Sequence, residues 1–249
     1  MTQPCVPSRP RAGILGRACR RGALAVLGAA AGCAAPPDHF HTLRPPLAAA
    51  PTSVRATPQQ LAIGPVTVPE SLGRAEWVIR GGDTAATVYS HQLWTQSLSA
   101  DVAQSLVDYL NGESLPDALW ATAGPTGAGS GTDLDTPPAL RVRVQVLRMD
   151  SLLAPAPAIS DQVRWTIECL PADPALAHAD VARYIAVRSA VRDFSRAAAG
   201  PTSADDAQQR FDRIAGAHSE TVHLVAQDIA GALRESAAER ARDCRLSAR

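Results

Sequence analysis

The first strand of the folded part reads Leu61-Ala-Ile-Gly-Pro-Val-Thr-Val-Pro69 and continues as Glu70-Ser-Leu-Gly-Arg-Ala-Glu-Trp-Val-Ile-Arg80. Leu61 and Ile63 alternate with small neighbours, and the two valines that follow alternate again, which is the pattern of a half-buried β-strand. The alternation slips by one residue at the Gly-Pro pair. The strand must therefore be bulged or bent there if both apolar pairs face one core.

The prolines of this strand predict its position in the sheet. Proline cannot donate to a β-ladder, so Pro65 and Pro69 favour an edge position or a strand end. Another chain can pair with the open groups of an edge. Gly64, Pro65, Thr67 and Pro69 are therefore candidate partner-binding residues. The alternative is that the prolines only protect an unused edge against aggregation.

The remaining elements follow from hydrophobic periodicity, and together they predict an α+β fold. We expect a mostly antiparallel or mixed sheet with two amphipathic helices packed on one face. One apolar stripe runs from Trp94 to Leu110 and leaves Asp101 and Asp108 on a solvated face; the other runs to about Glu235 and is interrupted near Gly216. Further strands are expected over 76–80, 85–89, 117–122, 140–148, 162–170 and 184–194.

The charge balance argues against a nucleic-acid partner. All 24 basic residues are Arg, and they match 24 acidic residues. Five of these arginines precede Cys33 in a stretch without acids, so the remainder is mildly acidic at −5. Proteins that bind nucleic acid instead present clustered positive charge.

The N-terminus has the organisation of a lipoprotein leader. After the basic segment comes an apolar run over 22–32, which is shorter than the ~20 residues that span a bilayer and so indicates a signal sequence. The run ends at Ala30-Ala-Gly-Cys33, which resembles a lipobox except that Ala30 stands where Leu is usual. We expect Cys33 to be lipidated and to anchor the protein in a membrane. The alternative is an ordinary secretory signal that happens to contain a cysteine.

The sequence therefore divides into four parts: a signal peptide over 1–32, a lipid anchor and Pro-rich tether over 33–60, a single domain over 61–236, and a charged, frayed tail over 237–249. Proline-rich spacers are extended, so the tether is expected to hold the domain away from the membrane. It contains His39-Phe-His41, which is either half of a zinc site or a pair of polar positions on an edge strand.

Two further features leave alternatives open. Cys169 and Cys244 are the only other cysteines expected in the mature protein, and they either form a disulfide in an oxidising compartment or stay buried as thiols. Arg141, Arg143 and Arg164 share one face of the predicted sheet, where they either bind anionic headgroups or pair with acidic neighbours.

No motif for catalysis or cofactor binding is present in the sequence. His218 and His223 are five residues apart, about 140° around a helix, so they cannot share a metal as an H-E-x-x-H pair does. The sequence also lacks a G-x-S-x-G elbow and a Gly-rich dinucleotide fingerprint. We therefore expect no enzyme, no cofactor and no metal site.

The first strand also carries a family resemblance. Ile63-Gly-Pro-Val-Thr-Val-Pro69, followed by Leu72 and by a second strand ending at Arg80, resembles the PqiC-like lipoproteins, the ABC-type transport auxiliary lipoprotein family. The resemblance extends over roughly 33–233 and implies a subunit that docks a PqiB-like MCE protein in intermembrane lipid transport, with a homo-oligomeric ring as a further expectation.

The lipoprotein resemblance also implies a location. Ala34 follows Cys33, where Asp would retain a lipoprotein in the inner membrane, so the outer membrane and its periplasmic face are expected. An alternative function is an envelope lipoprotein that acts as a cofactor for assembly or for a cell-wall enzyme.

Overall fold

The structure is a computed structural model of the 249-residue chain. It describes residues 36–45, 59–80, 84–113, 115–116, 119–124, 140–154, 156–170, 184–198 and 207–244. The expected signal peptide and Cys33 lie outside these residues. From Asp38 onward the chain belongs to one compact unit.

The larger of two sheets has five strands in the order β5-β2-β6-β7-β8. β2 runs parallel to both β5 and β6, whereas β6, β7 and β8 form an antiparallel meander. The α+β prediction is confirmed, with mixed sheets. The bounds are β2 Gln59–Thr67, β5 Leu119–Ala123, β6 Leu140–Leu152, β7 Ala158–Cys169 and β8 Ile185–Ala197.

The smaller sheet has three strands in the order β1-β4-β3. These are β1 His39–His41, β4 Ala86–Trp94 and β3 Glu76–Arg80, and a 3-10 turn over Glu70–Leu72 connects β2 to β3. β1 is parallel to β4, and β3 is antiparallel to it. Within the segment predicted as a Pro-rich tether, His39–His41 thus form the edge strand that was one of the two alternatives for the histidine pair.

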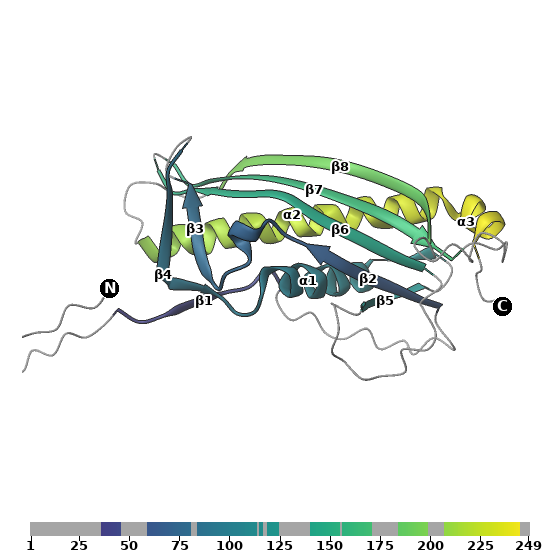
Figure 1. Ribbon diagram of the computed structural model, residues 1–249, viewed down its shortest axis with the longest axis horizontal. Helices are drawn as coiled ribbons and strands as arrows, with labels where there is room; N and C mark the ends of the chain where they lie inside the picture. The colour runs from purple at the N-terminus through teal and green to yellow at the C-terminus, as the bar shows by residue number, and fades with distance from the viewer. Residues whose placement is uncertain are drawn as a thin grey trace, which may run out of the picture. The chain divides into compact units, whose positions relative to one another are not determined.

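Two helices, α1 Leu98–Gly112 and α2 Ala207–Glu235, lie on one face of the five-stranded sheet (Figure 1). The predicted helix at 94 began too early, because Trp94 ends β4 and the Ser97 side chain caps the N-terminus of α1. The expected interruption near Gly216 is also wrong, because α2 runs through it without a break. Its apolar stripe is long enough to hold the helix together by packing alone.

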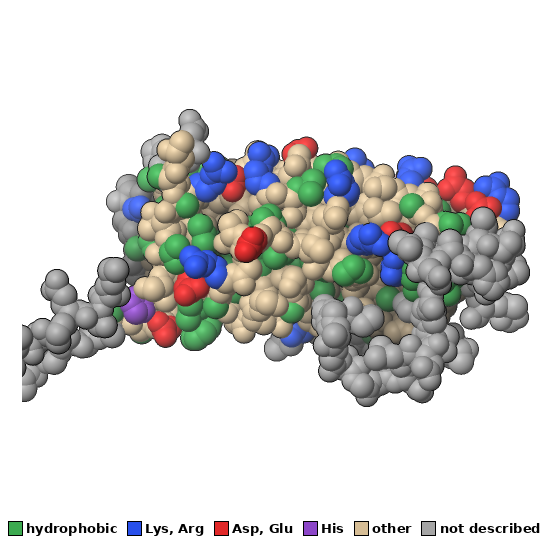
Figure 2. Space-filling model, viewed as in Figure 1, with side chains coloured by type: hydrophobic (Ala, Val, Ile, Leu, Met, Phe, Trp, Pro, Cys, Tyr) green, Lys and Arg blue, Asp and Glu red, His purple; other side chains and the backbone are tan. Residues whose placement is uncertain are grey.

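The alternation predicted for β6 and β7 is confirmed, since every inward-facing residue that it named is buried, from Leu140 to Val146 on β6 and from Val163 to Cys169 on β7. The other face of this sheet carries the arginines, interspersed with acidic side chains (Figure 2). Arg141 and Arg143 both pair with Glu168, at 2.6 and 3.3 Å, and Arg164 donates to Gln145. On this face the alternative of acidic pairing therefore holds for Arg141 and Arg143.

The edge position predicted for the first strand is wrong, because β2 lies between β5 and β6. The predicted slip is real: the pairing with β6 shifts between Ile63 and Val66, so Pro65 falls in a β-bulge. A bulge is another place where a sheet tolerates proline. Pairing with β5 ends at Ile63, so the ladder there requires no donor from Pro65.

The predicted frayed tail instead forms helix α3, Ala237–Asp243, and Cys244 after it forms a disulfide with Cys169 at the end of β7. The Cα atoms of the two cysteines are 5.6 Å apart. Buried Arg240 holds the junction between the helices by donating to Leu233 O and to Ser236 Oγ.

Candidate functional site: the N-terminal arm and its seat

Residues 38–44, which we call the arm, connect the leader to the folded unit. The arm contains β1 and two residues that are almost fully buried, His41 and Leu43, with exposed fractions of 5% and 0%. It lies five residues after Cys33, the expected lipidation site. The contacts of the arm therefore decide how a lipid on that cysteine would be coupled to the fold.

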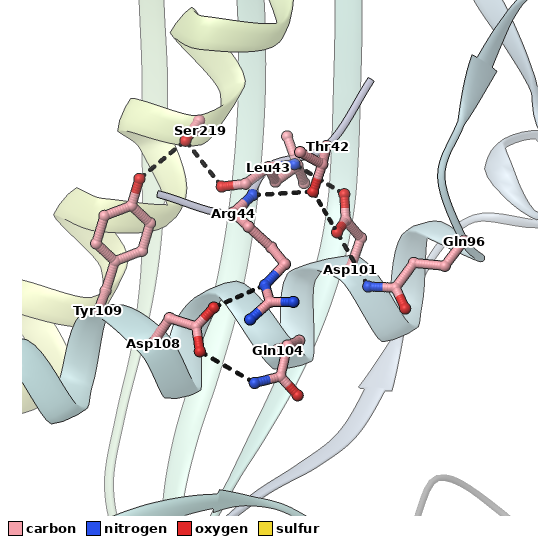
Figure 3. Close-up of polar contacts among 9 residues, drawn as sticks. All are labelled: Thr42, Leu43, Arg44, Gln96, Asp101, Gln104, Asp108, Tyr109 and Ser219. Atoms are coloured by element: carbon pink, nitrogen blue, oxygen red, sulfur yellow. Dashed lines mark hydrogen bonds and ion pairs between the residues drawn. The ribbon is translucent and has the colours of Figure 1, made fainter. Parts of the chain in front are cut away.

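Asp101 in the first turn of α1 is the centre of the seat that receives the arm (Figure 3). Its Oδ1 accepts hydrogen bonds from Thr42 Oγ1 at 2.9 Å and from Gln96 Nε2 at 3.0 Å, and its Oδ2 accepts one from the Leu43 N–H at 2.8 Å. The expectation of a solvated Asp101 is wrong, because the residue is fully buried. Three donors and the positive end of the helix dipole compensate its desolvation.

The second half of the seat uses both helices. Ser219 on α2 donates to the Leu43 carbonyl at 2.8 Å, and Tyr109 on α1 hydrogen-bonds the same serine hydroxyl at 2.8 Å (Figure 3). Leu43 thus has its N–H bound by α1 and its C=O bound through α2, which satisfies both backbone groups of a buried residue.

Outside the buried part, Arg44 donates from Nε to Asp108 Oδ2 at 2.8 Å, and Gln104 holds the other oxygen of Asp108 at 3.0 Å. The side chains of Arg44 and Asp108 are 46% and 25% exposed. Such a pair contributes little free energy in water. It adds a surface contact between the arm and α1.

At the other end of the arm, His41 faces the core. One ring nitrogen lies 2.7 Å from Gln92 Oε1, the other lies 3.6 Å from an Asp212 carboxylate oxygen, and the ring packs edge-on against Trp77 at 4.9 Å. Its neighbour Asp38 lies 2.8 Å from His91 Nδ1. β1 is an edge strand of the small sheet, as one of the two alternatives for the histidine pair expected. Among the described residues, no group of three or more metal-binding side chains comes together.

The structure also brings together Ser151, His218 and Asp161, of which the sequence analysis considered only His218, and that as a metal ligand. Ser151 Oγ lies 2.8 Å from His218 Nε2, and His218 Nδ1 lies 2.9 Å from Asp161 Oδ2. This is the order of contacts in a Ser-His-Asp triad. The three residues come from β6, α2 and β7, so no short motif announces them.

The environment of this cluster fits a structural role. Ser151 and His218 are each 1% exposed, and the serine oxygen also accepts a hydrogen bond from Trp77 Nε1 of β3 at 3.2 Å. A nucleophile must reach its substrate, whereas this oxygen is enclosed between the two sheets. The cluster therefore ties the small sheet to β6, β7 and α2.

A hollow of about 630 Å³ lies between β8 and α2. Arg188 pairs with Glu235 at 3.2 Å, and Arg192 forms two hydrogen bonds with Asp228, at 2.9 and 2.8 Å. These hydrogen bonds and the negative charge of Asp228 raise the pKa of the Arg192 guanidinium. Because its charges are paired in this way, the hollow does not favour a charged ligand.

The predicted partner-binding residues lie close together along β2 and just after it, but β2 is not an edge strand. Gly64 is buried in the bulge, Pro65 and Thr67 are exposed, and half-buried Pro69 precedes the 3-10 turn.

Within the part of the chain that the structure describes, no helix combines the length and the apolar character needed to cross a bilayer.

Comparison with solved structures finds proteins with a similar fold. The crystal structure of protein XCC0632 from Xanthomonas campestris, of family DUF330, is similar at 12% identity and a TM-score of 0.52, over 81% of this chain and 99% of that one. The hypothetical protein CT253 from Chlamydia trachomatis matches at 16% identity and a TM-score of 0.41, over 71% and 98%. The first likeness concerns the fold alone. The comparison with curated proteins gives no match.

A family model covers the region from the arm to α2. The model for the ABC-type transport auxiliary lipoprotein component matches residues 41–230, which confirms the resemblance seen in the first strand. The match begins inside the arm and spans well over half of the chain. This chain therefore belongs to the family of ABC-type transport auxiliary lipoprotein components.

Proposed function

We propose that this protein is the outer-membrane lipoprotein subunit of an MCE-type intermembrane lipid transport system. It is anchored on the periplasmic face through acylated Cys33, and it docks a PqiB-like MCE protein. Its contribution is binding and positioning, without catalysis. The family membership supports a transport auxiliary role, and the lipobox-like Ala30-Ala-Gly-Cys33 supports the anchor.

The seated arm is the observation that carries this proposal. Hydrogen bonds from both helices hold residues 42–44, and Asp38, only five positions after Cys33 in the sequence, already lies against His91. A lipid attached to Cys33 would therefore position the whole folded unit. A short connection of this kind suits a docking subunit that must stay at the membrane.

Acylation is tested by mass spectrometry of the mature N-terminal peptide and by membrane fractionation. We expect lipid on Cys33 and its loss in Cys33→Ser, which should leave unprocessed or soluble protein. Cys19→Ser, inside the leader, is the matched control and should be acylated normally. A mature protein that starts elsewhere and carries no lipid would refute the anchor.

Docking is tested separately by co-purification from detergent-solubilised envelopes of the native host. We expect an MCE protein to be the main partner recovered with the acylated chain. Recovery of a cell-wall enzyme in its place would replace the transport role with the alternative of an envelope cofactor, and would leave the anchor intact.

A further inference from the structure

The short stretch of sequence between Cys33 and the arm limits how far the folded unit can lie from a membrane. This argument rests on the proposed acylation of Cys33. Five residues span at most about 18 Å when fully extended, so Asp38 must stay within about that distance of the lipid headgroups. By comparison, α2 has 29 residues and is about 44 Å long. The chain end that carries β1 is therefore the part held at the membrane.

The outer face of the small sheet carries four apolar side chains, with Glu76 opposite one of them, Leu93. Side chains alternate across a strand, so while His41, Trp77 and Trp94 point into the core, their neighbours point outward. We call these outward residues the apolar strip: Phe40, Val78, Val88 and Leu93. Register supports the grouping, because Phe40 is paired with Leu93, and Val78 with Val88.

Two residues of the apolar strip are open to solvent, whereas Val78 and Leu93 are half-buried. Phe40 is 63% exposed, the highest fraction among the large apolar side chains described, and Val88 is 44% exposed. Charged side chains next to the strip are paired: Glu76 lies 3.8 Å from Arg74, and Arg80 lies 3.3 Å from Asp150. The strip thus presents apolar surface with locally balanced charge.

We propose that the apolar strip rests on the lipid surface that holds Cys33. Phe40 follows Cys33 by only seven residues, which span at most about 25 Å, so the phenyl ring is within reach of the lipid surface that holds Cys33. Aromatic and aliphatic side chains at the headgroup boundary add to lipid anchoring. The acyl chains supply the affinity, and the strip sets the orientation, so that the small sheet faces the bilayer and the large sheet remains available for a partner.

The chain offers matched control positions. Trp120 on β5 and Val191 on β8 are 40% and 41% exposed, close to Val88, but they belong to the large sheet. β5, in the large sheet, and β4, in the small sheet, lie toward opposite ends of the view in Figure 1. A label at either control position should remain in water when the strip is on the membrane.

The test uses acylated full-length protein in vesicles of phosphatidylethanolamine and phosphatidylglycerol. Phe40→Cys, Val88→Cys, Trp120→Cys and Val191→Cys are each labelled with an environment-sensitive fluorophore. We expect labels at 40 and 88 to shift to the blue and to be quenched by lipid-borne quenchers. Labels at 120 and 191 should be quenched by aqueous iodide.

The outcomes separate this proposal from the one on which it rests. If the protein floats with the vesicles but iodide quenches all four labels equally, the strip does not face lipid and the anchor stands. If the protein does not float, the acylation fails and this proposal fails with it. Protection at 40 and 88 that persists without vesicles and grows with protein concentration would assign the strip to a second copy.

A second variant tests whether the strip acts as a unit. Phe40→Asp should still float, because the acyl chains hold it, but a label at 88 should lose its blue shift. Trp120→Asp is the control and should leave that shift unchanged. An unchanged shift in Phe40→Asp would show that the ring does not orient the sheet.

Discussion

At the residue scale, Asp101 is the side chain on which the arm depends. Asp101→Ala leaves the buried Leu43 N–H and the Thr42 hydroxyl without partners, and each orphaned group costs about 1–3 kcal/mol. We expect a loss of about 3 kcal/mol in the free energy of unfolding, measured by urea denaturation. The Leu43 amide should also exchange faster with deuterium.

A matched substitution distinguishes the buried carboxylate from the charge in general. Asp108→Asn removes a half-exposed ion pair and should cost less than about 1 kcal/mol. An equal loss in the free energy of unfolding for the two variants would mean that the buried Asp101 carboxylate stabilises the fold no more than that of Asp108.

The Ser151-His218-Asp161 cluster makes a prediction that is chemical as well as structural. Ser151→Ala leaves the Trp77 Nε1–H and the imidazole with fewer partners, and should destabilise the fold by about 1–3 kcal/mol in thermal or urea unfolding. A fluorophosphonate probe for activated serines should leave the folded wild-type protein unlabelled. Labelling that disappears in Ser151→Ala would establish a catalytic serine and overturn the structural interpretation.

These two clusters show why the sequence could not predict the site. Asp101 was assigned to a solvated face because helical periodicity considers only one packing partner, whereas the arm covers a second side of α1. Ser151, Asp161 and His218 come from three elements, and only tertiary structure brings them together. The lone His218 on an apolar stripe was the one visible signal.

At the element scale, the bulge in β2 is where the sequence was most informative. The parity slip at Gly64 predicted it, and Gly64 has a φ of +132°, a region that side-chain-bearing residues avoid. Gly64→Ala should therefore lower the free energy of unfolding by about 1–3 kcal/mol. Gly216→Ala, on the exposed side of α2 with no atom near a new Cβ, is the control and should raise it by about 0.5–1 kcal/mol.

The position of β2 was predicted wrongly because a sheet tolerates proline both on an edge strand and in a bulge. The sequence alone does not show which strands pair with β2. The large sheet has two edge strands, β5 and β8; β8 is the longer, and its partly exposed side chains gave the weakest alternation of the long strands. If the family's expected ring forms through a strand edge, β8 is the edge to test.

Val191→Lys places a charge on this edge strand, a common protection against strand pairing. We expect smaller complexes by size-exclusion chromatography with light scattering, at an unchanged melting temperature. Leu147→Lys, on β6 within the same sheet and 37% exposed, is the control. Complexes of the same size in both variants would exclude β8 as the contact.

At the scale of the whole molecule, the fold class was predicted correctly because it depends on the local alternation of apolar and polar side chains. This alternation is the same whatever the order of the strands in the sheet. The strands over 140–148 and 162–170 were placed within β6 and β7, and the long stripe was found within α2. The two-sheet division was not predicted, because it depends on β1, three residues hidden in a proline-rich segment. Its pairing with β4 is set by the arm contacts, which connect residues more than 50 positions apart.

The last constraint on the whole molecule is the disulfide between Cys169 and Cys244, which joins the end of β7 to the chain after α3. Of the two alternatives left open by the sequence, the pairing is the one observed. The bond closes a loop with a sequence separation of 75 residues. In the chain-entropy model such a cross-link stabilises the fold by about 4 kcal/mol, because it restricts the unfolded chain.

Cys169→Ala combined with Cys244→Ala should lower the urea midpoint accordingly, while the wild type treated with reductant should approach the same value. In the denatured, unreduced wild type, thiol-specific labelling should find neither cysteine reactive, and two reactive thiols would contradict the bridge.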